Sequence, residues 1–160
     1  MSKAFDVLTE VINHADFPVP DCWQLARYQP NEEIIRSGDK GECLYMIRRG
    51  RVRVIGKVEL EQDRQVKPGM ADLDTGEIFG ELVLFDQAPR SATVMALEQC
   101  ELAVIDSEKL RQFLQANPEL GFRFLRELTS TLVGRLRHAN DKIYSLLAWG
   151  LKAHGIDKHL

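Results

Sequence analysis

Several features are scarce in this chain of 160 residues. Its three cysteines, Cys22, Cys43 and Cys100, are scattered and show no CxxC or Cys/His spacing. Neither a disulfide framework nor a metal site is therefore expected. A basic excess is also missing, because the formal net charge is −3. Proteins that bind nucleic acid or anionic membranes in general usually carry such an excess, so both classes are disfavoured, although a local anion pocket stays compatible.

Long apolar runs are missing as well. No run is long enough to span a bilayer, and the opening stretch MSKAFDVLTEVINHADF lacks the apolar core of a signal peptide. We therefore expect a cytoplasmic protein that does not associate with membranes. The length, with 44% hydrophobic and 28% charged residues, fits one globular domain with a real core.

The hydrophobic pattern changes twice along the chain. Phe5, Leu8, Val11 and Ile12 follow a helical spacing and predict a short helix over residues 3–14. Alternating and β-branched residues then dominate, separated by glycine turns, which favours an antiparallel barrel or sandwich. The clearest strands are predicted at residues 33–36, 44–47, 52–55, 93–96 and 102–105.

The pattern returns to helix after residue 106. Asp106 or Ser107 can cap one helix, and Asn117-Pro118 supplies the cap and first turn of a longer helix. That longer helix carries an apolar repeat with steps of three and four: Leu125, Leu128, Leu132, Leu136, Ala139, Ile143 and Leu146. The repeat resembles a coiled-coil seam and predicts a homodimer, while packing against the chain's own barrel is the alternative.

Four regions follow from these patterns. We expect an N-terminal helical segment at 1–22, a β-barrel at 23–105, C-terminal helices at 106–152 and a tail at 153–160. The predicted fold class is mainly β with flanking helices: an antiparallel, jelly-roll or cupin-like double-stranded β-helix with an N-terminal helix and a long C-terminal helix.

The segment FGELVLFDQAPRSATV, residues 79–94, carries the most specific chemistry. Arg90 offers a planar fork of donors for a phosphate or carboxylate, whereas Glu81 only accepts and suits hydroxyls or cations. Gly80 permits close approach, and the small residues Ser91 and Ala92 can leave main-chain N–H groups open to an anion. This combination matches a sugar diol joined to a phosphate. The alternative is a surface ion pair worth at most about 1 kcal/mol.

The longer string GEIFGELVLFDQAPRSATV resembles the phosphate-binding cassette of the cyclic nucleotide-binding domain family, nearest to the catabolite-activator sensor domains. The turn IIRSGDKG and the hairpin LYMI with Gly50 and VRV are similar to the same family. The resemblance covers roughly residues 25–150. It implies a cyclic nucleotide ligand, no other cofactor and no metal.

The resemblance also implies roles for individual residues. Arg90 would pair with the cyclic phosphate, Glu81 would accept from the ribose 2′-hydroxyl, and Val52 would pack near the base or sugar. The full set of expected ligand-binding residues is Gly80, Glu81, Leu82, Arg90, Ser91, Ala92, Val52 and Asn140.

The sequence does not decide whether the cyclic nucleotide carries adenine or guanine. Asn140 lies where the activator has a pair of polar residues that reach adenine, and its amide suits either adenine or guanine. An interhelical or solvated role for Asn140 is an equal alternative. Cyclic AMP is favoured and cyclic GMP stays open. The segment 56–76 is longer than the activator's, so we expect a modified flap there.

We therefore expect a free-standing sensor, not an enzyme, that signals to an unknown effector protein by movement of the C-terminal helix. A transcription regulator of the activator type is the first alternative, although no winged helix follows and no direct DNA binding is expected. An enzyme using Glu81 as a base, or a haem sensor using His138, has little support in the sequence.

Overall fold

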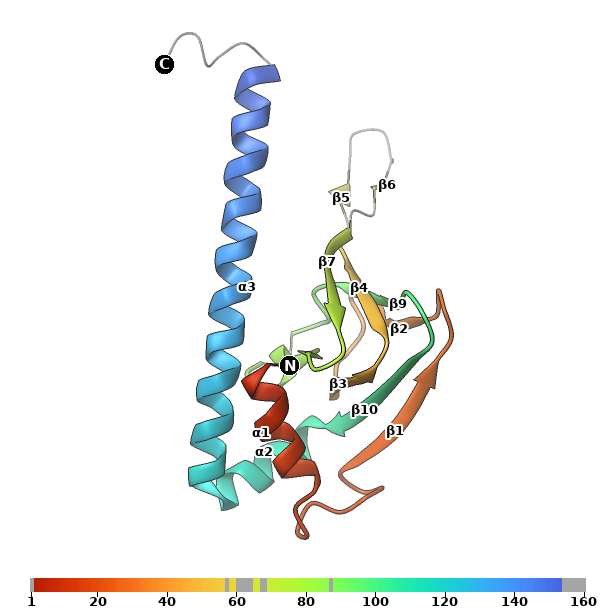
Figure 1. Cartoon of the computed structure of the whole chain (residues 1–160), viewed down its shortest axis with the longest axis vertical. Helices are drawn as coiled ribbons and strands as arrows, with labels where there is room; N and C mark the ends of the chain where they lie inside the picture. The colour runs from red at the N-terminus through yellow and green to blue at the C-terminus, as the bar shows by residue number, and fades with distance from the viewer. Residues whose placement is uncertain (1, 57, 60–64, 67–68, 87, 154–160) are drawn as a thin grey trace.

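The protein is a barrel of two antiparallel sheets, with a short N-terminal helix and a long C-terminal helix packed against each other on one side of it (Figure 1). The structure, a computed structural model, describes residues 2–56, 58–59, 65–66, 69–86 and 88–153. The architecture confirms the predicted fold class: mainly β, jelly-roll-like, with one helix before the barrel and a long helix at its end.

Strands that are far apart in sequence pair within each sheet, as a jelly roll requires. The first sheet has the order β1 (Trp23–Tyr28), β10 (Cys100–Asp106), β3 (Cys43–Arg49) and β8 (Ile78–Phe79). The second has the order β2 (Glu33–Ile35), β9 (Thr93–Ala96), β4 (Arg51–Ile55) and β7 (Gly69–Asp74). The short strands β5 (Val58–Glu59) and β6 (Gln65–Val66) pair with each other between β4 and β7.

Two apolar clusters hold the molecule together. One lies inside the barrel and includes Val52 and Leu102, both fully buried. The other joins the outside of the first sheet to the helices, with Leu8, Phe124 and Leu128 among its fully buried members. The helices therefore contribute buried side chains to the hydrophobic core.

Most predicted elements occur at the expected places. Helix α1 spans Lys3–Ile12, and the five predicted strands appear as β2, β3, β4, β9 and β10. The sequence pattern did not predict β1, β7, β8 or the short strands β5 and β6. The sequence of β1, WQLARY, lacks a clear apolar alternation, and all six residues are half-buried or exposed. Strand β7 starts at Gly69, the glycine of a Pro-Gly pair, and such a pair is typical of a turn.

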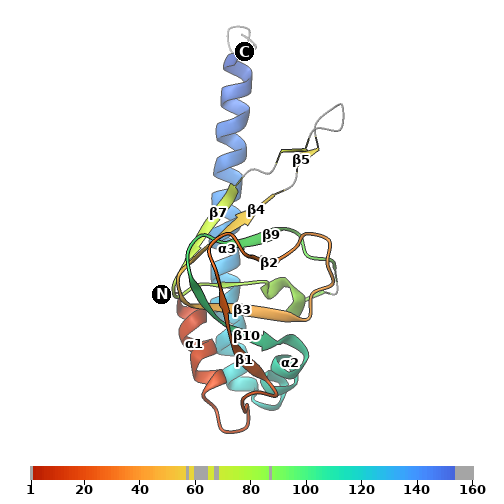
Figure 2. The same cartoon turned by 90° about the vertical axis from the view of Figure 1, so that its right-hand side faces the viewer.

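The C-terminal helices begin where their caps predict. The Asp106 side chain accepts from the Lys109 N–H at 2.9 Å and caps α2, Ser107–Ala116. Helix α3 spans Pro118–Ala153, which corresponds to about 54 Å at 1.5 Å per residue. Figures 1 and 2 both show α3 running along the barrel and continuing beyond it. Apart from Ala153, the predicted tail lies outside the described residues.

The predicted apolar repeat of α3 does not form one free face, which corrects the seam assigned from the sequence. Leu128 is fully buried in the core and Leu132 packs against the same cluster. Leu136 and Ile143 are 61% and 54% exposed. The helix is apolar on two sides, and one side already covers its own barrel.

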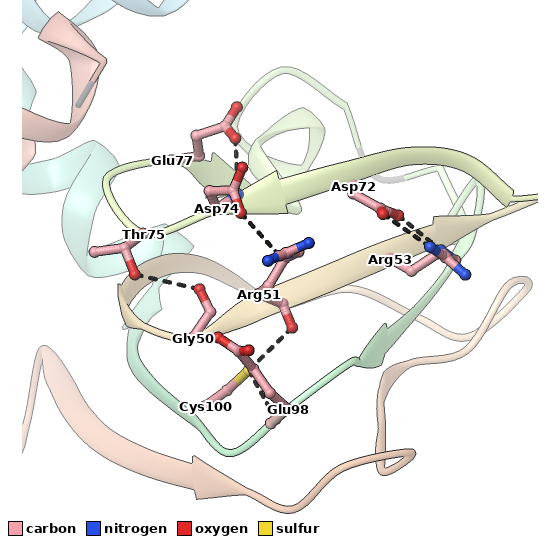
Figure 3. A network of polar contacts seen from close by, with 9 residues as sticks. All are labelled: Gly50, Arg51, Arg53, Asp72, Asp74, Thr75, Glu77, Glu98 and Cys100. Atoms are coloured by element: carbon pink, nitrogen blue, oxygen red, sulfur yellow. Dashed lines mark hydrogen bonds and ion pairs between the residues drawn. The ribbon is translucent and has the colours of Figure 1, made fainter.

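Ion pairs fasten β7 to β4 on the outer face of the second sheet (Figure 3). Arg53 makes a bidentate contact with Asp72 at 2.7 and 2.8 Å, and Arg51 lies 3.1 Å from Asp74. The Arg53 guanidinium holds the pKa of Asp72 below its usual value. The Glu77 carboxylate accepts from the Asp74 N–H at 2.9 Å, so this network ends at the turn that leads into β8.

Candidate functional site

The segment after β8 makes a tight turn that turns Glu81 inward. Gly80 has φ 72° and ψ 12°, a left-handed conformation that glycine adopts readily. One turn of 3₁₀ helix, η1, follows at Glu81–Leu84. Glu81 is 5% exposed, while Leu82 beside it is 46% exposed. The cassette thus buries its carboxylate and turns an apolar side chain outward.

The buried carboxylate of Glu81 is paired with the long helix. Arg135 Nη1 of α3 donates to Glu81 Oε1 at 3.0 Å, and Arg135 Nη2 donates to the main-chain oxygen of Ile78 at 2.5 Å. A buried charge is stable only when it is paired or well hydrogen-bonded, so this contact compensates the burial of Glu81. It also joins the cassette directly to α3.

The sequence reading missed Arg135. The sequence contains a clue to its role. Arg135 lies seven residues, or about two helical turns, after Leu128, so the two side chains share the side of α3 that packs on the rest of the chain. A cation on an otherwise apolar face that covers a core needs an acidic partner. Its identity as Glu81 could not be read from the sequence, because 54 residues separate the two.

Arg90 is held by main-chain oxygens. Its Nη1 donates to Gly80 O at 3.1 Å and its Nη2 donates to Cys43 O at 2.6 Å. Its Cζ lies 5.9 Å from the centre of the Tyr45 ring. A Cβ at Gly41 would lie 2.7 Å from this Cζ, so a side chain there would occupy the place of the guanidinium. These contacts leave N–H donors of Arg90 available to an anion.

Two polar side chains close to Arg90, Tyr45 and Cys43, stay uncharged at neutral pH. Burial raises the pKa of Tyr45 to about 12. Burial also raises the pKa of the Cys43 thiol, against the opposing effect of the Arg90 charge. Neither group can therefore neutralise the guanidinium.

The residues after Arg90 have main-chain N–H groups that are not engaged by the described part of the chain. The Arg90 N–H donates to Asp39 O, and the Gly38 N–H donates to Arg90 O, both at 2.8 Å. This ladder holds the cassette against the turn before β3. Within the described residues, the N–H groups of Ser91 and Ala92 have no hydrogen-bond partner. They lie directly beside the one arginine of the cassette.

The other two predicted site residues, Val52 and Asn140, come from different elements. Val52 of β4 is fully buried inside the barrel. Asn140 of α3 is exposed, and five residues of helix place it about 140° around the axis from Arg135. The structure thus brings Gly80, Glu81, Arg90, Ser91 and Ala92 into one segment but does not bring Asn140 to the pocket of its own chain.

The described part of the chain meets the requirements of neither a metal site nor a membrane-spanning helix. There, no cluster of three His, Cys, Asp or Glu side chains could hold a metal ion, and no helix combines the length and apolarity of a membrane span. A cavity of about 690 Å³ lies between residues 16–22 and α2. None of its lining residues belongs to the cassette.

Comparison with protein families gives a match to the model described as "Cyclic nucleotide-binding domain" over residues 25–117. The chain is 34% identical over 121 residues to the cAMP-activated global transcriptional regulator CRP of Salmonella typhimurium. That alignment covers 75% of this chain and 54% of the relative, so the chain spans about half the length of the curated relatives it matches.

Solved structures give the same result. A cyclic nucleotide-binding domain from Methylobacillus flagellatus is 26% identical with a TM-score of 0.69, covering 89% of this chain and 83% of that one. The catabolite activator protein of Thermus thermophilus is 25% identical with a TM-score of 0.67, covering 91% of this chain and 63% of that one.

Proposed function

Because the chain belongs to the cyclic nucleotide-binding domain family, we propose that it is a sensor that binds a cyclic nucleotide, with cyclic AMP favoured, in the cassette of residues 80–92. One observation carries the proposal. The Arg90 guanidinium donates to the carbonyl of Gly80, the residue before the buried Glu81, and the two residues that follow Arg90 have no hydrogen-bond partner for their N–H groups within the described residues. An anion site and an acceptor site therefore adjoin each other.

Arg90 binds the exocyclic oxygens of the cyclic phosphate in this proposal. The Ser91 hydroxyl and the N–H groups of Ser91 and Ala92 add donors to the same oxygens. A cyclic phosphate carries a single negative charge, so one guanidinium with main-chain dipoles balances it and no metal is required. Tyr45 and Cys43 are neutral and do not balance the charge of Arg90.

Glu81 accepts from the ribose 2′-hydroxyl, and the main chain of Gly80 and Leu82 completes the sugar contacts. Glu81 already pairs with Arg135, so a bound ribose shares or displaces that contact. Val52 supports the barrel wall behind the sugar or base and has no exposed surface of its own.

The Glu81–Arg135 pair is the proposed route from ligand to α3. A ligand that changes this contact favours one arrangement of α3 over another, and coupling of this kind is typically about 1–3 kcal/mol. Movement of α3 then changes the surface offered to an effector protein. No step of this scheme needs catalysis, so we propose a binding module and not an enzyme.

The proposed active form is a homodimer through the exposed side of α3. Leu136 and Ile143 on that side are more than half exposed, and large apolar side chains in a row usually mark an interface. Asn140 on the same side would meet a nucleotide only across such a dimer.

A thermal-shift panel with cyclic AMP, cyclic GMP and non-cyclic AMP tests the function. A ligand that prefers the folded state raises the unfolding temperature. We expect the largest rise with cyclic AMP and none with AMP, whose dianionic phosphate lacks the ring. Equal responses to all three nucleotides, or no response, would contradict the proposal.

A transcriptional role is the second candidate, because the Salmonella relative is named a transcriptional regulator. The net charge of −3 disfavours direct DNA contact by this chain. A gel-shift experiment at physiological salt, with and without cyclic AMP, separates the two functions.

A further inference from the structure

Strand β1 forms a free edge of the first sheet. Its six residues, Trp23–Tyr28, pair with β10 on one side, and within the described residues no strand pairs with its other side. Figures 1 and 2 both show β1 at the outer border of the barrel, on the side away from α3. An edge of this kind presents a row of main-chain donors and acceptors that an added strand can bind.

The main-chain groups of every second residue of β1 point away from β10. The Asp106 N–H donates to Cys22 O at 3.0 Å, so the residue that precedes the strand already bonds to β10. Because these groups alternate in direction along an antiparallel pair, the even-numbered residues bond to β10 and Trp23, Leu25 and Arg27 face outward. Within the described part of the chain, the outward N–H and C=O groups have no hydrogen-bond partner.

The other edges of the two sheets are protected in ways that β1 is not. Strand β7 has a shifted register with β4, and its Met70 carbonyl accepts from Lys142 of α3. The Ile78 carbonyl of β8 accepts from Arg135, and β2 has only three residues. Strand β1 has a continuous register with β10 and contains no proline, glycine or lysine. It therefore lacks the features by which proteins prevent strand addition.

The side chains along this edge determine which strand fits it. Side chains alternate between the two faces of a strand, so Trp23, Leu25 and Arg27 share one face. Leu25 is 46% exposed, and Trp23 is half-buried against the outer apolar cluster. The Arg27 side chain is 71% exposed and uses its Nε on Glu101 at 3.3 Å, which leaves its Nη donors for a second carboxylate.

We propose that the free edge of β1 binds an extended segment of a partner protein as an added antiparallel strand. The segment carries an acidic residue opposite Arg27 and apolar residues opposite Leu25 and Trp23. Since the two strands run in opposite directions, its sequence reads acidic, any, apolar, any, apolar. The antiparallel direction matches the rest of this sheet and is the more stable one per residue. Main-chain bonds supply affinity and the alternate side chains supply specificity.

Fluorescence anisotropy with a synthetic peptide tests the pairing on the full chain, without nucleotide, because the inference does not depend on the cassette. The probe is fluorescein-labelled Gly-Thr-Glu-Thr-Val-Thr-Leu-Thr-Gly, and we expect saturable binding. Methyl groups on the valine and leucine nitrogens, which face β1, should weaken binding at least about tenfold, as should lysine in place of glutamate. Methyl groups on the threonine nitrogens at either side of the valine, which face away, should leave binding unchanged.

Leu25→Pro tests the edge in the protein itself. Proline removes an N–H that β10 does not use, and edge strands tolerate it at such a position. The circular dichroism spectrum should therefore stay as in wild type, while peptide affinity falls at least about tenfold. Arg27→Glu should reverse the preference between the glutamate and lysine peptides. Arg36→Glu is the matched control, because the Arg36 side chain is also 71% exposed and paired with a glutamate, and it should change neither affinity.

Three results would overturn the inference. The first is no binding of the glutamate peptide, and the second is binding that the methyl groups facing β1 do not weaken. The third is sedimentation showing association of wild type that Leu25→Pro abolishes, because a second copy and not a partner protein would then cover the edge. If Leu25→Pro did not fold, the reversed preference expected of Arg27→Glu would decide in its place.

Discussion

Arg135 of α3 lies 3.0 Å from the carboxylate of Glu81, one of two buried polar residues in the described part of the chain. The residue proposed to hold the ribose is thus also the residue that holds the long helix. This double use explains why ligand and helix position should affect each other: both compete for, or share, the oxygens of one carboxylate. The pair is a direct contact between the cassette and α3.

Arg135→Gln should therefore lower the free energy of unfolding of the ligand-free protein by about 2 kcal/mol. Loss of one partner of a fully buried pair costs about 3–5 kcal/mol, and the figure is lower here because the Arg135 side chain is 31% exposed. Denaturant titration measures the change. Arg137→Gln, with the same charge change two residues further on the exposed side, should stay within about 0.5 kcal/mol of wild type. Equal effects of the two variants would contradict a special role of the pair.

Arg90→Leu should weaken cyclic nucleotide binding by at least about a hundredfold and leave the fold intact. Two charge-assisted hydrogen bonds to phosphate are lost, each worth about 1.5–3 kcal/mol. The fold should persist because the partners of Arg90 are main-chain oxygens and not a buried carboxylate. Isothermal titration measures the affinity and circular dichroism the fold. Arg27→Leu, on exposed β1, is the control, and a normal affinity for Arg90→Leu would refute the cassette assignment.

The local part of the site was predictable because its signals lie within a few residues of each other. The small residues around Arg90 and the glycine before Glu81 define a turn with open N–H groups whatever the rest of the chain does. The structure has a left-handed Gly80, a 3₁₀ turn at 81–84 and unengaged N–H groups after Arg90. Backbone chemistry of this kind is encoded locally.

The contacts of α3 were not predictable for the opposite reason. Its sequence is apolar on two sides, so periodicity alone could not tell which side meets the barrel. Leu128 is buried in the core and Leu136 is exposed to solvent, although both fit one repeat with steps of three and four. The choice depends on the surface that α3 meets, which is formed mainly by α1 from the opposite end of the chain together with α2 and the first sheet.

Leu136→Glu should dissociate the proposed dimer. A carboxylate would face its own counterpart across an apolar interface, where it has neither water nor a cation, and we expect at least about a hundredfold weaker association. Sedimentation velocity over a concentration series measures it. Ser145→Glu introduces the same charge on the other side of α3 and should leave association unchanged. Cyclic AMP binding by a monomeric Leu136→Glu variant would place the pocket within one chain, whereas its loss would favour a site completed across the dimer.

Alanine substitutions at Gly80 and Gly38 distinguish the effect of backbone strain from the effect of displacing Arg90. Gly80 and Gly38 both have left-handed backbones, with φ 72° and 91°. Alanine at either position should lower the free energy of unfolding by about 1–2 kcal/mol. A Cβ at Gly80 would also lie 2.9 Å from Arg90 Nη1, whereas a Cβ at Gly38 meets nothing within 4 Å.

Gly80→Ala should therefore lose nucleotide affinity, by about tenfold or more, because one hydrogen bond from a displaced guanidinium is worth about that factor. Gly38→Ala should keep the affinity despite a similar loss of stability. Denaturant titration measures the free energy of unfolding of each variant, and isothermal titration measures its nucleotide affinity. If affinity fell equally in both, strain in the barrel and not the position of Arg90 would control binding. If Gly80→Ala bound normally, the guanidinium would be free to move, and its contact with the Gly80 carbonyl would have no part in holding the phosphate.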